Sequence, residues 1–211
     1  MGTGLTTLLH KKLNDTETGS IVNDTTQSGG AAAGAAMTLL SQNQWEAQRS
    51  MGPIVAPKQQ TTIDCWNVRT IAEATQTAQV AKEMADYGIE VLGISETRWK
   101  GLGSATLQSG VKVLYVGDEE VRQGGVAIMI SARAKRALME WTPISKRIIE
   151  ARFYSKYKKL AVIQTYAPTN DGVDEENDEF YNQLQDTISR CNRHDMIVLM
   201  RDLNAKIGSN C

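Results

Sequence analysis

The feature that most constrains this chain is a short apolar run, Met196–Met200, followed at once by the letters RDLNAKIG. An apolar run of this length with β-branched residues predicts a buried strand. Alternate residues leaving a strand point the same way, so Asp202 and Asn204 should present a carboxylate and an amide together. In open α/β sheets this carboxyl edge usually carries the chemistry. The alternative is an Asx turn, in which both side chains bond the local backbone and Gly208 closes the loop.

Length and composition set the class of protein. A chain of 211 residues suits one domain, or one domain with a tail. Its 41% hydrophobic and 22% charged residues are typical of a globular protein, and a net charge of −1 provides no overall basic field for nucleic acid. A local basic groove stays open. Three cysteines lack both metal-ligand spacing and the even count of a disulfide framework, which indicates reduced thiols in an intracellular protein.

Two kinds of segment are not predicted. No apolar run approaches the roughly 18 residues that a membrane span needs. The first residues lack the basic-then-apolar order of a signal peptide, and no other targeting signal is evident. We therefore expect no contact with a membrane.

The chain divides at about residue 60. Residues 1–60 are dominated by small and polar residues, and 29–36 are almost entirely Gly and Ala. Such a segment buries too little apolar surface to offset its ordering entropy, so we predict a mostly disordered, low-complexity tail. Residues 61–211 carry the regular patterns and form the predicted domain.

Apolar periodicity predicts the elements of this domain. The expected strands are 61–68, 89–94, 111–116, 125–130, 144–154, 160–165 and 196–200, and the expected helices are 70–86 and 174–190. Strand, helix and strand over 61–94 with short joints predict neighbouring parallel strands. Residues 144–154 and 160–165 should form a hairpin. The pair Gly101 and Gly103 resembles a dinucleotide-binding loop, but no third Gly and no helix follow, so we discount it.

Polar side chains follow strand after strand. Candidates at strand carboxyl ends are Asn67, Glu96, Tyr166, Asn170, Asp202 and Asn204. Any one of them is compatible with a cap or turn, whereas several together suggest one convergent site. The set is rich in oxygen and contains no thiolate, and the two histidines, His10 and His194, lie elsewhere. Hard oxygen ligands favour Mg²⁺ or Mn²⁺ over zinc, and Mg²⁺ is usual where the substrate is a phosphate ester.

Five motifs occur in one order: WNVRT from Trp66, ISETRW from Ile94, GVAI from Gly125, QTYAPT from Gln164 and DLNAKIG from Asp202. In this order they resemble the endonuclease/exonuclease/phosphatase superfamily. Within it, the resemblance is to the apurinic-type endonuclease domain of non-LTR retrotransposons and to craniofacial development protein 2-like proteins. The resemblance covers about residue 61 to the end and implies an α/β fold, a two-sheet β-sandwich flanked by helices.

The resemblance also implies roles for single residues. Glu96 matches the family's metal-binding glutamate, and Asn67 the asparagine that supports the metal and the phosphate. Tyr166 matches a tyrosine that contacts the scissile phosphate. Asp202 matches the aspartate that positions or deprotonates the attacking water, and Asn204 the asparagine that binds a phosphate oxygen. These roles suit the reaction, which needs a Lewis acid, an oriented nucleophile and donors for developing charge.

Further contacts and departures complete the comparison with the family pattern. Arg98 and Arg147 are candidates for additional phosphate contacts, against the alternative of solvated surface arginines. Arg201 stands where the family has Gly. The family's later Asp-His segment has no counterpart before Cys211, so the resemblance implies a partial domain with its last strands missing and an incomplete catalytic set. Uncovered apolar residues are then expected on the strands at 125–130 and 196–200.

The function implied is Mg²⁺- or Mn²⁺-dependent hydrolysis of a phosphodiester, with DNA nicking as in retrotransposon endonucleases. An enzyme acting on DNA would work in the nucleus. A basic group in the sequence, at 146–147, 152 and 156–159, is read either as a solvated face or as a DNA contact. Two alternatives stay open: an inactive fragment that serves as a binding surface, and a phosphatase of the same superfamily. The oligomeric state is not indicated.

Overall fold

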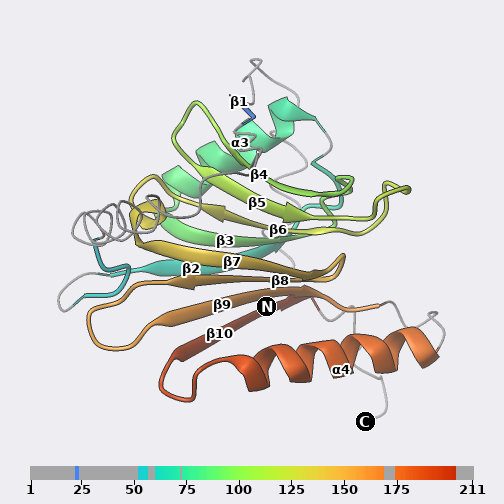
Figure 1. Ribbon diagram of the computed structural model, residues 1–211. Coiled ribbons are helices and arrows are strands. Elements are labelled where there is room, and N and C mark those ends of the chain that lie inside the picture. Colours follow the sequence, from blue (N-terminus) through green and yellow to red (C-terminus); the bar gives the residue numbers. More distant parts are fainter. Residues whose placement is uncertain (1–21, 24–51, 57–59, 72, 169–173, 203–211) are drawn as a thin grey trace, which may run out of the picture.

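Two β-sheets pack face to face and a helix covers the outer face of each (Figure 1). The computed structural model describes residues 22–23, 52–56, 60–71, 73–168 and 174–202. The first sheet has six strands in the order β1-β4-β5-β6-β3-β2, and the second has four in the order β10-β9-β8-β7. The two-sheet sandwich with outer helices predicted from the resemblance is confirmed.

The elements follow one another as printed here. They are β1 (Val22–Asn23), β2 (Thr62–Asn67), α3 (Ala74–Asp86), β3 (Ile89–Ser95), β4 (Leu102–Thr106), β5 (Lys112–Val116), β6 (Val126–Ile130), η1 (Ala134–Ala137), β7 (Leu138–Ser145), β8 (Ile148–Phe153), β9 (Leu160–Tyr166), α4 (Asp174–Arg190) and β10 (Met196–Asp202). β2 and β3 are parallel neighbours joined by α3, as the strand–helix–strand pattern predicts. β8 and β9 form the predicted hairpin, and β10 adds in parallel to β9.

Two strands were not predicted. β4 lies where the sequence offers Leu-Gly-Ser-Ala-Thr, which has no apolar alternation, and its position in a strand agrees with discounting a dinucleotide loop there. β7 is an edge strand of the second sheet and contains Pro143, a residue that weakens a strand prediction but is tolerated at an edge. Both strands are defined by pairing with neighbours and not by their own periodicity.

Three apolar layers hold the sandwich together. The central layer joins residues of β5 and β6, such as Leu114 and Ile128, to residues of β8 and β9, such as Phe153 and Val162. α3 packs Val80 and Met84 on the outer face of the first sheet. α4 packs Phe180, Leu184 and Ile188 on the outer face of the second sheet.

The expected loss of cover is wrong for β6 and only partly matched for β10. All five residues of β6 are buried, because β6 lies inside the six-stranded sheet between the central layer and the layer under α3. On β10, Met200 is buried while the Ile197 side chain is 40% exposed. The uncovered apolar surface is therefore confined to the edge strand.

Core contacts begin before the predicted domain boundary. Ile54 is 2% exposed in the central layer, and its backbone N–H donates to the Tyr154 carbonyl at 2.9 Å. The Thr61 hydroxyl donates to the Ile54 carbonyl at 2.5 Å. The division into a tail of residues 1–60 and a domain of residues 61–211 stays a prediction, and most of the tail lies outside the described residues. Within the described residues, no helix is long and apolar enough to cross a membrane.

Asp118 fixes the loop between β5 and β6. One carboxylate oxygen accepts the backbone N–H groups of Glu120 and Val121, at 3.0 and 3.1 Å, and the other accepts from Lys146 Nζ at 3.1 Å. These donors, the backbone pair first and Lys146 after it, lower the pKa of Asp118 to about 2. The loop is thereby tied to the β7–β8 turn that carries Lys146.

We expect Asp118→Asn to change the pH dependence of stability. A carboxyl whose pKa is lower in the folded chain contributes stability above its ordinary pKa, and this contribution is lost as pH falls through the folded value. The free energy of unfolding of the wild type should therefore fall between about pH 4 and pH 2 more steeply than that of the variant. Urea unfolding at a series of pH values measures both curves, and parallel curves would contradict the anchoring role.

The two sheets come closest at Gly93 of β3. A β-carbon there would lie 1.9 Å from Gln164 Oε1 and 2.6 Å from Met200 Cε. Gln164 is fully buried, and its Nε2 donates to the Ser95 hydroxyl at 3.2 Å. Glycine at position 93 therefore allows the strand that ends at Ser95 to lie directly against β9 and β10.

We expect Gly93→Ala to destabilise the protein by about 1–3 kcal/mol, because an added methyl forces buried side chains to shift. Gly52→Ala is the control, since a β-carbon at Gly52 meets nothing within 4 Å. Urea unfolding monitored by circular dichroism compares the variants. Equal stability of the two would show that Gln164 and Met200 rearrange without cost.

Candidate active site at the carboxyl edge of both sheets

Four strands end at one edge of the sandwich. β2 and β3 are parallel, and Asn67 is paired with Ser95. β9 and β10 are parallel, and Tyr166 is paired with Asp202. The carboxyl ends of β2 and β10 face each other because each strand lies at the edge of its own sheet.

Asn67 joins the two predicted acidic residues. Its amide nitrogen donates to Glu96 Oε1 at 2.8 Å and to Asp202 Oδ2 at 2.5 Å. Its amide oxygen accepts the backbone N–H of Arg69 at 2.9 Å. One amide therefore holds a carboxylate from each sheet in a fixed position. Three residues that are far apart in sequence form one cluster, as their places at strand ends predict.

The backbone at this edge is strained. Three residues other than glycine have positive φ among those described: Arg69 at 56°, Glu96 at 60° and Arg98 at 57°. Residues with a β-carbon rarely adopt this left-handed conformation, and each such residue costs on the order of 1–3 kcal/mol. All three directly follow β2 or β3. Strain of this kind collects where a structure must aim particular side chains, which fits a functional edge.

Neighbouring groups hold the strained segment in place. The backbone N–H groups of Thr97 and Arg98 donate to the carbonyls of Gly125 and Gly124, at 3.3 and 2.8 Å. Both glycines have positive φ, and a β-carbon on Gly125 would lie 2.6 Å from Thr97 Oγ1. Trp99 donates its ring N–H to the Ile71 carbonyl at 2.8 Å. Trp99 also packs edge-on against Tyr115, so it acts as an anchor and not as an exposed platform for bases.

Tyr166 lies on the other side of the Gly124 backbone. A β-carbon on Gly124 would lie 3.6 Å from its ring, and Tyr166 is 9% exposed. The Arg147 guanidinium stands 5.4 Å from the centre of this ring, within the range of a cation–π contact. Arg147 Nη1 also donates to the Tyr166 carbonyl at 3.5 Å.

A cavity of about 480 Å³ opens beside the cluster, between the facing edges of β2 and β10. Its lining residues are Cys65, Trp66, Asn67, Arg69, Ser95, Arg201 and Asp202. Arg201, which replaces the family's Gly, therefore borders this cavity. Desolvation of the sulfur raises the pKa of the Cys65 thiol, the Arg201 backbone N–H lowers it, and the Asp64 and Asp202 carboxylates raise it further. The net rise makes Cys65 a poor nucleophile.

The chemistry of the cluster fits a hard divalent cation. Two carboxylates face each other across one amide, and oxygen is the donor that Mg²⁺ and Mn²⁺ prefer. Within the described part of the chain, no three Asp, Glu, His or Cys side chains converge on one point. Glu96 and Asp202 are thus the charged donors that the described residues provide. The Asn67 amide oxygen is engaged by Arg69 in this arrangement, so its role as a metal ligand stays a prediction.

Other predicted site residues have different outcomes. Asn204 and Asn170 lie outside the described residues. Arg98 is exposed, and its backbone is fixed by Gly124. The basic group of the sequence is not one patch, because 146–147 precede β8 and 156–159 follow it, at opposite ends of the strand. His194 lies in the joint between α4 and β10, away from the strand ends.

Sequence reasoning did not identify two supporting contacts. The first is the hydrogen bond from Gln164 to Ser95, which ties the second sheet to the strand end that carries Glu96. The second is the contact of Arg147 with Glu176 and Tyr166, from three separate elements. A polar Gln in an otherwise apolar strand is a signal for the first contact. No local pattern indicates the second.

Comparison with known proteins places this site in context. No family model matches the chain. Craniofacial development protein 2 from Bos taurus is 34% identical over 152 residues, 72% of this chain, and that from Tragulus javanicus is 33% identical over the same length. The chain spans only about a quarter of these relatives, 25% and 26% of their length.

Solved structures share the fold at low sequence identity. The AP endonuclease LMAP from Leishmania major superposes with a TM-score of 0.53 at 13% identity, covering 81% of this chain and 67% of that one. The endonuclease domain of TRAS1, a telomere-specific non-LTR retrotransposon, gives a TM-score of 0.50 at 14% identity, covering 70% and 60%. The resemblance is confirmed: the chain has the endonuclease/exonuclease/phosphatase fold and is similar in sequence to craniofacial development protein 2.

Proposed function

We propose that this chain is a metal-dependent phosphodiester hydrolase and that it nicks DNA. The observation that carries the proposal is the Asn67 amide, which holds the Glu96 and Asp202 carboxylates together at the carboxyl edge of both sheets. The similarity in fold to an AP endonuclease and to a retrotransposon endonuclease domain supports the same reaction class. Fold alone does not define a reaction, so the proposal depends on the site.

Glu96 would hold a Mg²⁺ or Mn²⁺ ion, with Asn67 at its side. When bound, the ion would act as a Lewis acid on the phosphoryl oxygens. The strained backbone at Glu96 directs its carboxylate toward Asn67 and Asp202 and away from the Arg147 side of the edge. In this proposal the strain is the cost of presenting one carboxylate from the first sheet to another from the second.

The remaining roles concern the substrate. Asp202 orients or deprotonates the attacking water, and it is positioned for this by the Asn67 N–H. Tyr166 contacts the scissile phosphate from the next strand, and Asn204 and Arg98 add phosphate contacts. We propose that residues 61–211 carry this activity, that the tail does not, and that an enzyme with this substrate works in the nucleus.

We expect Glu96→Gln to abolish most Mn²⁺ binding, because the substitution removes one of the charged donors from the site. Calorimetric titration of the full chain with Mn²⁺ measures the effect. Glu83→Gln is the matched control, since Glu83 lies on α3 and bonds Gln79 at a distance from the cluster. If Glu96→Gln and the wild type bind Mn²⁺ equally well, Glu96 is not the ligand.

We expect Asp202→Asn to slow Mg²⁺-dependent nicking of supercoiled plasmid by roughly 100-fold or more, the usual effect of losing a general base. Asp86→Asn, which removes one exposed carboxylate at the end of α3, should leave the rate unchanged. Nicking is followed on agarose gels with EDTA as a blank. A second substrate, a phosphomonoester, separates the alternatives.

Each alternative has its own outcome. Turnover of the phosphomonoester with intact plasmid would replace the nuclease by a phosphatase. Binding of DNA without turnover of either substrate would favour a binding surface. Nicking that is equal in Asp202→Asn and the wild type would reject Asp202 as the base.

A further inference from the structure

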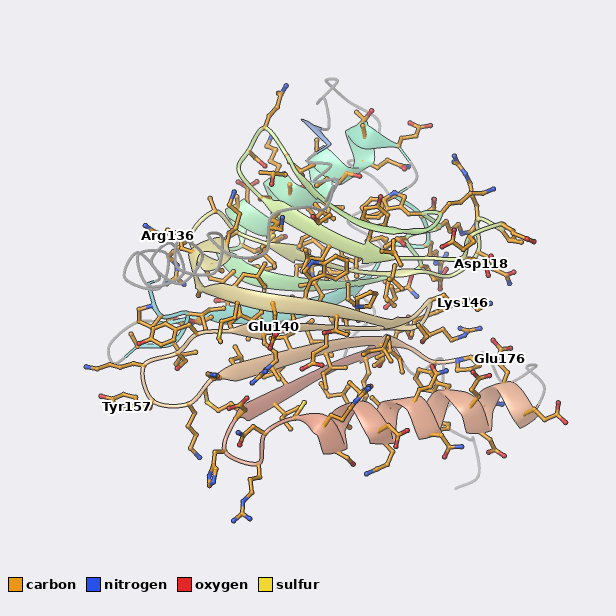
Figure 2. The ribbon with its side chains drawn as sticks, in the orientation of Figure 1. Asp118, Arg136, Glu140, Lys146, Tyr157 and Glu176 are labelled. Carbon is orange, nitrogen blue, oxygen red and sulfur yellow. The ribbon has the colours of Figure 1, made fainter. Side chains whose placement is uncertain are left out.

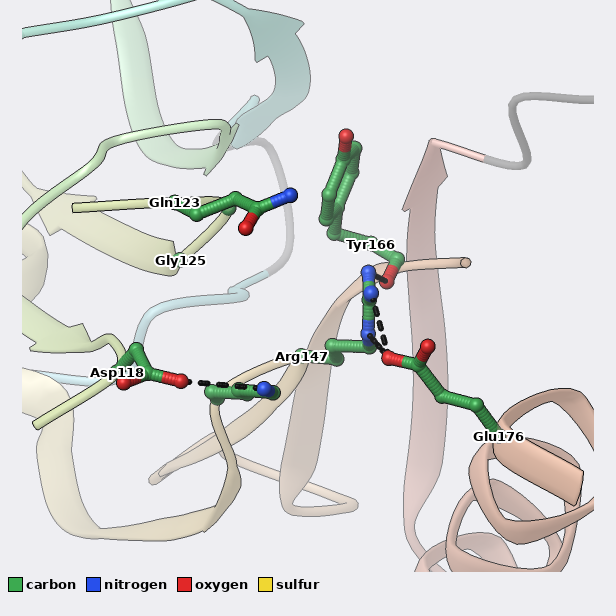
Figure 3. A pocket seen from close by; sticks show the side chains of 8 residues that line it. Asp118, Gln123, Gly125, Arg147, Tyr166 and Glu176 are labelled. Atoms are coloured by element: carbon green, nitrogen blue, oxygen red, sulfur yellow. Dashed lines mark hydrogen bonds and ion pairs between the residues drawn. The ribbon is translucent and has the colours of Figure 1, made fainter. Parts of the chain in front are cut away.

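A second, smaller cavity of about 220 Å³ lies on the other side of Tyr166 (Figure 3). Its lining residues are Asp118, Gln123, Gly124, Gly125, Lys146, Arg147, Tyr166 and Glu176. They come from the β5–β6 loop, the β7–β8 turn, the end of β9 and the first turns of α4. Asp118, Lys146 and Glu176 gather at one end of the sandwich, whereas Tyr157 lies at the other end (Figure 2).

Two cations line this cavity, and each is paired with a carboxylate from another element. Lys146 Nζ lies 3.1 Å from Asp118 Oδ2. Arg147 Nη2 and Nε donate to Glu176 Oε1, at 2.8 and 3.1 Å. In Figure 3, Arg147 stands between the Tyr166 ring and Glu176, and Gln123 points toward Tyr166.

The pairs are too exposed to be explained by stability alone. The Lys146 side chain is 50% exposed and that of Glu176 is 43% exposed. Ion pairs this accessible to water typically contribute about 0–1 kcal/mol. A ligand anion can therefore replace either carboxylate at small cost. Lys146 has three N–H donors and Arg147 has five, so both can donate to a ligand on entry.

The size and position of the cavity indicate a phosphate. About 220 Å³ is smaller than the usual pocket for a drug-sized ligand, roughly 300–1,000 Å³, but a phosphate group fits within it. Tyr166, proposed to contact the scissile phosphate, forms one wall. Gly124 and Gly125 form another, and their carbonyls hold the Thr97–Arg98 backbone next to Glu96. The cavity is thus one residue away from the proposed active site on two sides.

We propose that this cavity binds the phosphate next to the scissile one along the substrate strand, and that Lys146 and Arg147 are its donors. Asp118 and Glu176 occupy the two cations until the strand enters and compete with its phosphate. The inference rests on the proposed function, since it extends that site along a nucleic acid backbone. It makes binding depend on the exchange of two ion pairs within the protein for contacts with DNA.

This exchange has a consequence that a purely structural ion pair lacks. Removing the Glu176 carboxylate leaves Arg147 unpaired and available, so Glu176→Gln should bind DNA more tightly, by about two- to fivefold, the range of a surface ion pair. Removing the Lys146 ammonium should weaken binding and lower by about one the slope of log K against log salt, because one fewer counterion is released.

The experiment measures binding of a fluorescein-labelled 30-base-pair duplex to the full chain by fluorescence anisotropy, at several KCl concentrations and with Ca²⁺ in place of Mg²⁺. Matched controls remove the same charges at other places. Glu140→Gln breaks the pair of Glu140 with Arg152, at 2.6 Å, and Lys156→Ala removes a lysine from the β8–β9 turn. Thermal melting of each variant reports folding.

Tighter binding by Glu176→Gln together with a lower salt slope for Lys146→Ala, both absent from the two controls, supports the subsite. A wild type that binds DNA with variants that share its affinity and slope overturns the subsite and leaves the proposed function standing. Weaker binding by a folded Glu176→Gln also overturns it, since the pair would then be structural. If the wild type does not bind the duplex, both the DNA substrate and the subsite are rejected.

Discussion

The site depends on one amide that is shared by two carboxylates. Glu96 and Asp202 carry like charges, and the Asn67 N–H groups between them allow both to stay close without a cation. Because Glu96 follows the first sheet and Asp202 ends the second, the same hydrogen bonds fix the distance between the two sheet edges. The close approach at Gly93 serves this contact, since it sets β3 against β9 and β10. Core packing and the geometry of the site are therefore one problem.

The edge of the sandwich combines two kinds of electrostatic arrangement. On the β2–β10 side, carboxylates gather around a neutral amide, which suits a cation. On the Tyr166 side, two cations are balanced by two carboxylates, which suits an anion that can displace them. Tyr166 and the Gly124–Gly125 backbone separate the two sides. A polyanion held across this boundary would meet positive charge on both sides once a metal is bound.

The sequence predicted the strand–helix–strand unit, the terminal strand and the place of Asn67, Glu96 and Asp202. These features follow from periodicity and from the rule that parallel strands share a carboxyl edge. It did not predict β4 and β7, whose strand character comes from their partners. It also missed the positive φ of Glu96, because nothing in a glutamate suggests a left-handed backbone that the surroundings impose. The contact of Arg147 with Glu176 depends on where α4 docks, which no local pattern encodes.

The left-handed residues have a consequence for protein engineering. Glycine adopts this conformation without strain, so replacing Arg69, Glu96 or Arg98 by glycine should relax the backbone. A directed-evolution library that is screened only for heat resistance would be drawn to these three positions. Its most stable members would lose the side chains that the strained backbone presents. Thermostable descendants of this protein should therefore be selected for activity and stability together.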